Sequence, residues 1–278
     1  WSLSRKAISL EEQIKSGRFA IIYKAKMFSS HQTDADTVVV KSLKSDHTDK
    51  DLTLMKAKIN FYGSEVGNHP NVLKFFGAVE DTAMGPFMVL EYCENGTMKD
   101  YLTSHKDRVD EQMHERLFKF TFDVSKGMEY LANKKIVHRR LAARNILLTF
   151  LHEVKISGFG PVPNEDDENA KGERIPVKWL PPECIEASST RDATEKSDVW
   201  SYGIVMWEIF TLGDVPFPDI RAASLLSHLR KGERPPKPEY ADQKMHGLMK
   251  KCWNDTPKKR PSFAKLRAEL EILFVSSG

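Results

Sequence analysis

Short alternating runs of apolar and polar residues fill the first third of the chain and predict a small β-sheet. The predicted strands cover residues 8–14, 19–27, 37–44, 72–79 and 86–92. A helical spacing of apolar residues at 50–66 interrupts them, and His69-Pro70-Asn71 ends that helix. The first part of the chain is therefore expected to be β-rich with one helix.

Beyond Gly96 the spacing of apolar residues becomes helical, with two short strands expected at 146–148 and 154–156. The predicted helices cover residues 97–103, 110–133, 198–212, 222–230, 244–252 and 262–275. This order predicts an α+β fold with two lobes in a single domain, 1–278. The small β-rich N-lobe is expected at 1–91, the hinge at 92–96 and the larger helical C-lobe at 97–278.

Composition mainly excludes other classes of protein. The 278 residues are 40% hydrophobic and 29% charged, which is typical of a globular protein and excludes a disordered chain or a fibre. The longest apolar run, about 203–210, is too short to cross a bilayer, and Trp1 opens no signal peptide. A net charge of +3 gives no reason to expect a nucleic-acid partner. Three cysteines without ligand spacing indicate a reduced intracellular domain and no metal site.

Six short motifs follow one another in a specific order. The run H-R-R-L-A-A-R-N begins at His138, G-F-G begins at Gly158, V-V-V-K ends at Lys41, and P-P-E after P-V-K-W ends at Glu183. S-D-V-W-S-Y-G and C-W with a later R-P complete the order. This order resembles a protein kinase domain over almost the whole chain. L-A-A-R-N and P-V-K-W resemble the tyrosine-kinase branch, and the opening W-S-L-S-R resembles receptor tyrosine kinases.

The resemblance implies a nucleotide pocket and a set of structural residues. By resemblance, the pocket comprises Lys15, Gly17, Ala20, Ile22, Val39, Lys41, Leu90, Glu91, Cys93, Asn145 and Leu147. Structural roles fall to His138, Phe159, Glu183, Asp198 and Arg260. Glu183 is expected to pair with Arg260, and Asp198 is expected to hold the backbone of the catalytic loop.

Three positions depart from the family pattern where the chemistry is expected. Arg140 replaces the aspartate that accepts the substrate proton, and Gly158 replaces the aspartate that holds Mg²⁺. Arginine cannot act as a base, and general-base help is worth about 10²–10⁴ in rate. Ile59 stands where a helix glutamate should pair with Lys41, and a one-residue slip gives Lys58. The sequence therefore predicts no intact catalytic residue and no metal site.

The nucleotide cradle is also changed. Only Gly17 remains of the three expected glycines, and Lys15 restricts the backbone where phosphate should approach closely. Val39 and Ile22 add methyl groups to the adenine slot. We expect weak or absent binding of ATP and Mg²⁺, and therefore no cofactor.

The loop between Gly158 and Glu183 contains no tyrosine that phosphorylation could use to order it. It contains the acidic run 164–168. This run is interpreted either as a solvated loop tip or as a phosphate mimic that pairs with Arg139 or Arg140.

These departures predict a catalytically inactive tyrosine-kinase-like domain that is not an enzyme. It would be the cytoplasmic part of a single-pass receptor-like protein, with the membrane reached only through segments outside this chain. It would signal by docking or allostery with protein partners, such as an active kinase or a co-receptor. The alternative is an atypical active tyrosine kinase that recruits acids from elsewhere, for example Asp123 or the run 165–168. A third hypothesis is a nucleotide switch that needs no metal.

Overall fold

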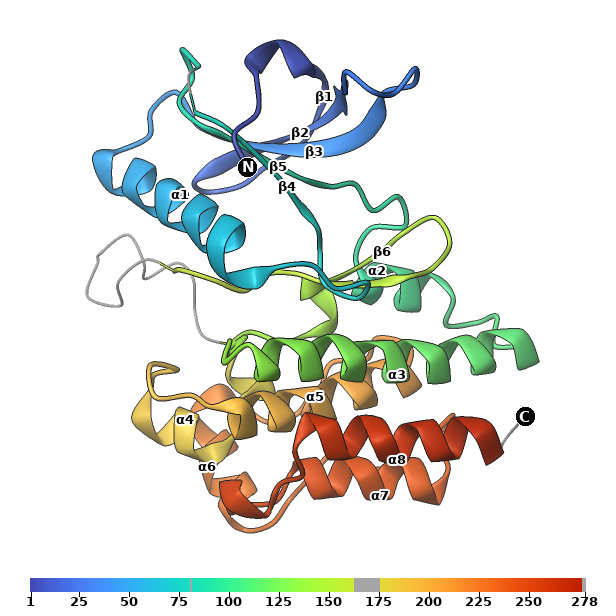
Figure 1. Cartoon of the computed structure of the whole chain (residues 1–278). Coiled ribbons are helices and arrows are strands. Elements are labelled where there is room, and N and C mark those ends of the chain that lie inside the picture. The colour runs from blue at the N-terminus through green and yellow to red at the C-terminus, as the bar shows by residue number, and fades with distance from the viewer. Residues whose placement is uncertain (81, 163–175, 277–278) are drawn as a thin grey trace. The chain divides into compact units, whose positions relative to one another are not determined.

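A computed structural model describes residues 1–80, 82–162 and 176–276, which form two compact units (Figure 1). The first unit contains Trp1–His69, Leu73–Glu94 and residues 160–162. The second contains Pro70–Val72, Asn95–Phe159 and residues 176–276. The predicted lobes are continuous stretches, whereas each unit here takes in a short segment from beyond its main stretch. The lobe and hinge limits given above stay predictions.

The first unit is built on a five-stranded antiparallel sheet in the order β1-β2-β3-β5-β4. Its strands are β1 (Ile8–Ser16), β2 (Ala20–Met27), β3 (Asp36–Leu43), β4 (Phe75–Val79) and β5 (Phe87–Glu91). Val38 and Val40 of β3 are fully buried against Ala25 and Val89 of the neighbouring strands. Since side chains alternate along a strand, this buried face leaves Val39 and Lys41 on the other face.

The helix predicted at 50–66 is divided into α1 (Asp49–Phe61) and a π-helical turn, η2 (Tyr62–Val66). A capping box between Thr48 and Asp51 begins α1. In η2, a Cβ atom on Gly63 would lie 2.4 Å from the ring of Trp1. The glycine therefore admits the N-terminal tryptophan, a contact that local spacing cannot reveal.

The N-terminal segment covers the edge of the sheet. Leu3 N–H donates to the Ala78 carbonyl at 2.8 Å, and Ala78 N–H donates to the Trp1 carbonyl at 3.0 Å. These bonds occupy the outer edge of β4, which an exposed strand would otherwise leave open to pairing. A short 3₁₀ turn, η1 (Arg5–Ala7), leads from this segment into β1.

The second unit is helical around α5. Its helices are α2 (Met98–Ser104), α3 (Glu111–Asn133), α4 (Pro182–Ala187), α5 (Glu195–Phe210), α6 (Ala222–Arg230), α7 (Gln243–Cys252) and α8 (Phe263–Ser276). Residues 197–210 of α5 are all buried, which identifies it as a central core helix. In Figure 1, α3 and α8 run side by side, and Phe118 and Phe274 stack between them at 5.6 Å.

The remaining elements connect these helices. They are the strand pair β6 (Ile146–Leu148) and β7 (Val154–Ile156) and the 3₁₀ turns η3 (Ala143–Asn145), η5 (Val177–Trp179) and η6 (Pro257–Lys259). The bounds of β6, β7 and α6 agree with the predicted ones. The short helix α4 and the 3₁₀ turns were not predicted. The α+β class with a β-sheet unit and a helical unit is confirmed.

Within the described residues, no helix combines the length and apolar character that crossing a bilayer requires.

Candidate active site

Predicted pocket residues of the first unit gather on one face of its sheet. Lys41 of β3 pairs with Ile22 of β2, which in turn pairs with Lys15 of β1. Val39 pairs with Leu90 of β5. Directly paired residues project to the same face of a sheet, so these five side chains share the face opposite the buried core. Ala20 lies on this face too, two residues before Ile22 on β2.

The ends of this face are formed by turns. Gly17 N–H donates to the Ala20 carbonyl at 2.9 Å and closes the hairpin between β1 and β2. Glu91 is the last residue of β5, and its carboxylate accepts the Lys74 N–H at 3.1 Å. Cys93 follows β5 and is buried.

Lys41 is an unusually acidic lysine. Burial, followed by the positive charges of Lys58 and Lys15, lowers its pKa to about 8. The α1 side chain whose charge acts on Lys41 is therefore Lys58, whereas Ile59 is 4% exposed and packed in the core. The two registers, with Ile59 or Lys58 at the family's acid position, both stay predictions. Lys58 adds a positive charge that acts on Lys41.

In the second unit, α5 holds the loop that begins at His138. Asp198 accepts the backbone N–H groups of His138 at 2.7 Å and Arg139 at 3.0 Å. Glu208 lies further along α5 than Asp198. Its carboxylate accepts the Ala143 N–H at 3.0 Å and the Trp179 indole N–H at 2.7 Å. Both ends of the loop are thereby fixed to one buried helix.

Glu208 is the site residue that sequence reasoning missed. It is 1% exposed, and burial raises the pKa of its carboxyl group. A glutamate inside an otherwise apolar helix is costly unless it is hydrogen-bonded. Its position within the apolar run 203–210 was the available signal.

Arg139 shows that the loop is strained. Its φ of 73° lies in the left-handed region, which a non-glycine residue rarely adopts. Asp198 binds its N–H, and its guanidinium donates to the Thr190 carbonyl at 3.0 Å. The surrounding bonds hold this conformation, as is common near functional sites.

His138 is buried in its neutral form. Its Nε2 lies 2.7 Å from the Ser157 carbonyl, and its Nδ1 lies 3.1 Å from the Arg140 N–H. Nε2 must therefore carry the proton while Nδ1 accepts. Burial lowers the His138 pKa to about 4, and Arg140 contributes to this shift. The centre of its ring lies 5.4 Å from that of Phe159, and its structural role stays a prediction.

Gly158 fits its position closely. Its φ is 79°, and a Cβ atom there would lie 2.7 Å from Cγ and Oδ1 of Asn145. Asn145 in turn donates to the Arg140 carbonyl at 2.7 Å. The side chain of Asn145 therefore fills the space that a larger residue at 158 would need.

The positive charge of Arg140 acts on Arg144. Burial lowers the pKa of Arg144, Glu208 opposes this shift, and the charge of Arg140 adds to it. The Arg144 guanidinium lies over the Trp179 ring, 4.8 Å from its centre. Trp179 is only half-buried, unlike the core tryptophans Trp200, Trp207 and Trp253.

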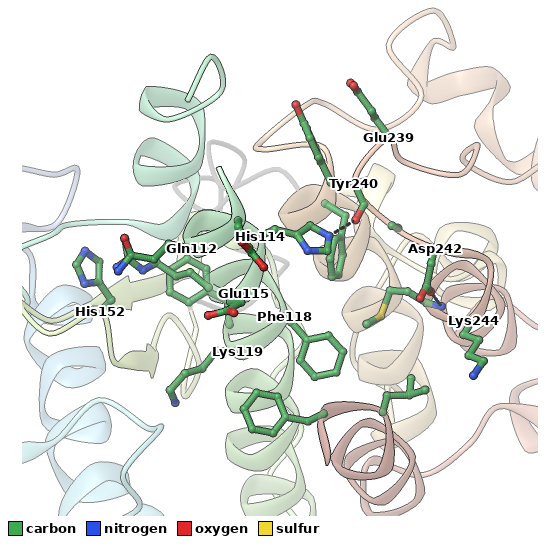
Figure 2. A pocket seen from close by; sticks show the side chains of 18 of the residues that line it. Gln112, His114, Glu115, Phe118, Lys119, His152, Glu239, Tyr240, Asp242 and Lys244 are labelled. Carbon is green, nitrogen blue, oxygen red and sulfur yellow. Dashed lines mark hydrogen bonds between the residues drawn. The ribbon is translucent and has the colours of Figure 1, made fainter. Parts of the chain in front are cut away.

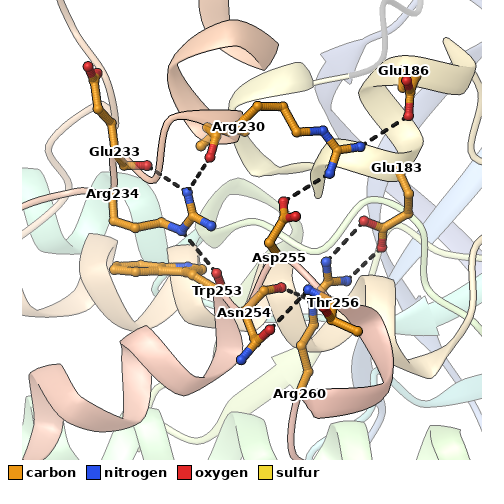
Figure 3. A network of polar contacts seen from close by, with 11 residues as sticks. Glu183, Glu186, Arg230, Glu233, Arg234, Trp253, Asn254, Asp255, Thr256 and Arg260 are labelled. Carbon is orange, nitrogen blue, oxygen red and sulfur yellow. Dashed lines mark hydrogen bonds and ion pairs between the residues drawn. The ribbon is translucent and has the colours of Figure 1, made fainter.

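An ion pair of the second unit joins α4 to the segment before α8 (Figure 3). The Arg260 side chain is fully buried and donates to both oxygens of Glu183, at 2.6 and 3.0 Å. It also donates to the carbonyls of Asn254 at 2.8 Å and Lys196 at 3.1 Å. This is the pairing that the resemblance implies. Arg230, in the same network, binds Glu186 and Asp255 at the surface.

The described residues do not fit Mg²⁺ well. Residues 1–80, 82–162 and 176–276 contain no group of three or more His, Cys, Asp or Glu side chains placed to hold a metal ion. Mg²⁺ requires oxygen ligands, usually including carboxylates. The acidic run 164–168 and its predicted roles lie outside the described residues.

A hollow in the same unit lies between α3, α8 and the start of α7 (Figure 2). It measures about 1140 Å³, and its lining includes Phe118, Tyr240 and Phe274. His114 Nε2 lies 2.9 Å from the Tyr240 carbonyl across one side of it. The lining shares no residue with the catalytic loop or the predicted pocket. This hollow is therefore not the candidate active site.

A β-sheet unit with a buried lysine on β3 and a helical unit with a fixed H-R-R-L-A-A-R-N loop are features of a kinase domain. The protein tyrosine and serine/threonine kinase family matches residues 8–270, and the chain belongs to this family.

Three of the relatives that match the whole chain are fibroblast growth factor receptors. Fibroblast growth factor receptor 2 of Dugesia japonica is 35% identical over 295 residues, and the match covers 32% of its length. Fibroblast growth factor receptors of Halocynthia roretzi and Ciona intestinalis are 34% and 32% identical, with 40% of each covered. The chain thus spans about a third to two fifths of these relatives.

These matches correct two predictions. The prediction that the domain is not an enzyme is wrong, because the chain belongs to a kinase family and resembles fibroblast growth factor receptors over its full length. The expectation of no cofactor is corrected as well, since the family uses ATP with Mg²⁺. Local replacements such as Arg140 and Gly158 did not justify either prediction.

Proposed function

We propose that this chain is an atypical protein tyrosine kinase domain that transfers the γ-phosphate of ATP to tyrosine. The observation that carries the proposal is the catalytic loop, which keeps its backbone bonds to Asp198 at 2.7 and 3.0 Å although Arg140 replaces aspartate. Similarity to fibroblast growth factor receptors over the whole of this chain, which spans 32–40% of their length, supports the tyrosine class.

The chemistry of phosphoryl transfer allows arginine to replace aspartate at position 140. Its transition state is loose, so catalysis depends mainly on positioning and on stabilising negative charge. Arg140 cannot take a proton, so no base stands at this position. The lack of a base is expected to cost about 10²–10⁴ in rate. Its guanidinium instead stabilises charge on the phosphoryl group in flight, as arginine does in other phosphoryl-transfer enzymes.

Lys41 is proposed to bind the ATP phosphates. Below pH 8 it carries the charge that these phosphates need, and Lys15 adds a second cation on the same sheet face. Val39 and Ile22 narrow this face, so weak nucleotide binding is expected. The described residues offer Mg²⁺ no carboxylate set, and no step here is assigned to it.

The surrounding context of the domain is also a proposal. The relatives are receptors of more than twice its length, which supports a place on the cytoplasmic side of a single-pass membrane protein. Its partners would then be protein substrates and co-receptors.

Phosphate transfer tests the proposal directly. The purified chain with ATP and a tyrosine peptide is expected to form phosphotyrosine about 100-fold or more slowly than the 1–100 s⁻¹ of ordinary kinases. Lys41→Met is expected to abolish the reaction, because it removes the phosphate-binding cation. Lys44→Met, just beyond β3, is the matched control and should retain the rate. Equal product from the wild type and Lys41→Met would refute the proposal.

A further inference from the structure

The turn between β6 and β7 exposes two large apolar side chains beside the hollow of Figure 2. Phe150 is 68% exposed and Leu151 is 72% exposed. Leu151 and the next residue, His152, also line the hollow. A projecting apolar tip and a hollow are therefore neighbours on one surface of the second unit.

Hydrogen bonds fix the shape of this tip. The His152 N–H donates to the Thr149 carbonyl at 2.9 Å, and the Glu153 N–H donates to the Thr149 hydroxyl at 3.0 Å. The Asn95 side chain donates to the carbonyls of Thr149 at 2.8 Å and Phe150 at 3.3 Å. An ordered turn thus presents the two apolar side chains, which lowers the entropy lost when they bind a partner.

The hollow provides apolar surface and enough room for such a tip. Phe274 of α8 is 47% exposed and stacks on Phe118 of α3 at 5.6 Å, and both residues line the hollow. The volume of about 1140 Å³ exceeds the roughly 300–1,000 Å³ that holds a drug-sized ligand. Apolar side chains exposed together on one surface mark a place where a partner can bind.

The charge of the lining changes sign along α3, which indicates what kind of partner fits. Glu111 and Glu115 come first, and Lys119 follows one turn later, all three exposed. Lys119 keeps this exposure although it binds Asp123 at 2.8 Å. An antiparallel copy of the same helix would bring Glu115 of each chain to Lys119 of the other. A wholly acidic or wholly basic partner would meet like charge at one end.

We propose that this surface is the interface of a symmetric dimer of this chain, in which the Phe150–Leu151 tip of each copy enters the hollow of the other. In a twofold dimer the same patch serves both copies, so it must contain the projecting group and its receptor together. The tip, the hollow and the mixed charge along α3 meet this condition. The lining contains no residue of the catalytic loop or the predicted pocket, so the interface does not rest on the proposed function.

Sedimentation velocity of the purified chain without ATP tests the interface. The wild type is expected to dimerise with a dissociation constant below about 100 µM. The double variant Phe150→Ser, Leu151→Ser is expected to raise this constant at least about tenfold, because a twofold dimer loses the apolar area of each tip twice. Val215→Ser is the matched control. Val215 is 48% exposed in the same unit and lies outside the lining, so this variant should dimerise as the wild type does.

A charge variant tests the antiparallel arrangement of α3. Glu115→Lys is expected to raise the dissociation constant at least about tenfold, because it places a lysine against Lys119 of the other copy. Asp219→Lys makes the same change of charge at an exposed site in the same unit that does not line the hollow. The dissociation constant of that control should stay within about twofold of the wild type.

Two results would overturn the proposal. One is a wild type that stays monomeric at about 100 µM, which would assign the hollow to a different partner. The other is an unchanged dissociation constant in either the tip variant or Glu115→Lys, each shown to be folded by its thermal unfolding curve. Phosphate transfer is measured separately. A monomeric chain that transfers phosphate refutes only the interface, whereas a dimer without phosphate transfer refutes only the proposed function.

Discussion

Replacing Arg260 with alanine is expected to lower the free energy of unfolding by about 3–5 kcal/mol. Its side chain is fully buried, and it donates to Glu183 and to the carbonyls of Asn254 and Lys196. Its removal leaves the Glu183 carboxylate and both carbonyls without this donor. It also removes a cation that lies over the Trp200 ring at 5.1 Å. Chemical denaturation of the two proteins measures the difference.

Arg230→Ala is the matched control in the same network (Figure 3). Arg230 forms two ion pairs, with Glu186 at 3.0 Å and Asp255 at 2.9 Å, but its side chain is 40% exposed. Exposed pairs contribute about 0–1 kcal/mol, so this variant should lose less than Arg260→Ala. Equal losses of unfolding free energy in Arg260→Ala and Arg230→Ala would show that burial does not decide how much each arginine contributes.

The second large effect depends on pH and on Asp198. Burial raises the pKa of this carboxyl group to about 7, against an ordinary value of 3.8. A raised pKa contributes stability that is fully present below pH 3.8 and is lost as the pH rises through 7. Asp198→Asn removes this titration. The stability of the wild type relative to Asp198→Asn is therefore expected to fall by about 2–3 kcal/mol between pH 5 and pH 8.

Urea denaturation at several pH values measures this difference. Ser201→Ala provides the control, because it removes from the same helix a hydroxyl group that does not titrate and that donates to the Trp179 carbonyl. The relative stability of that variant should stay constant with pH. If the wild type instead gained stability relative to Asp198→Asn as the pH rises, the two N–H bonds would lower the pKa of Asp198 more than burial raises it.

Much of the fold could be predicted because its signals are local. The spacing of apolar residues placed β6, β7 and α6 at their observed bounds. The contact of Gly63 in η2 with the Trp1 ring could not be predicted, because it joins residues far apart in the sequence. The short helix α4 lies in a proline-rich stretch whose spacing resembles a loop.

The site was predictable to a smaller extent. Motif order identified Lys41, Asp198 and the pair Glu183–Arg260, whose contacts the structure now describes. The choice between Ile59 and Lys58 depends on how α1 is rotated, which motif counting cannot fix. The prediction of inactivity failed for another reason. The charge change at Arg140 and Gly158 is real, but phosphoryl transfer depends on charge stabilisation that several side chains can provide.

Arg140 is proposed to stabilise the transferred phosphoryl group through its positive charge. Single-turnover formation of phosphotyrosine with Arg140→Gln isolates this charge, because glutamine, like arginine, cannot act as a base. The rate with Arg140→Gln is expected to be at least about tenfold below that of the wild type. A rate equal to or above that of the wild type would show that the arginine charge does not stabilise the transferred group.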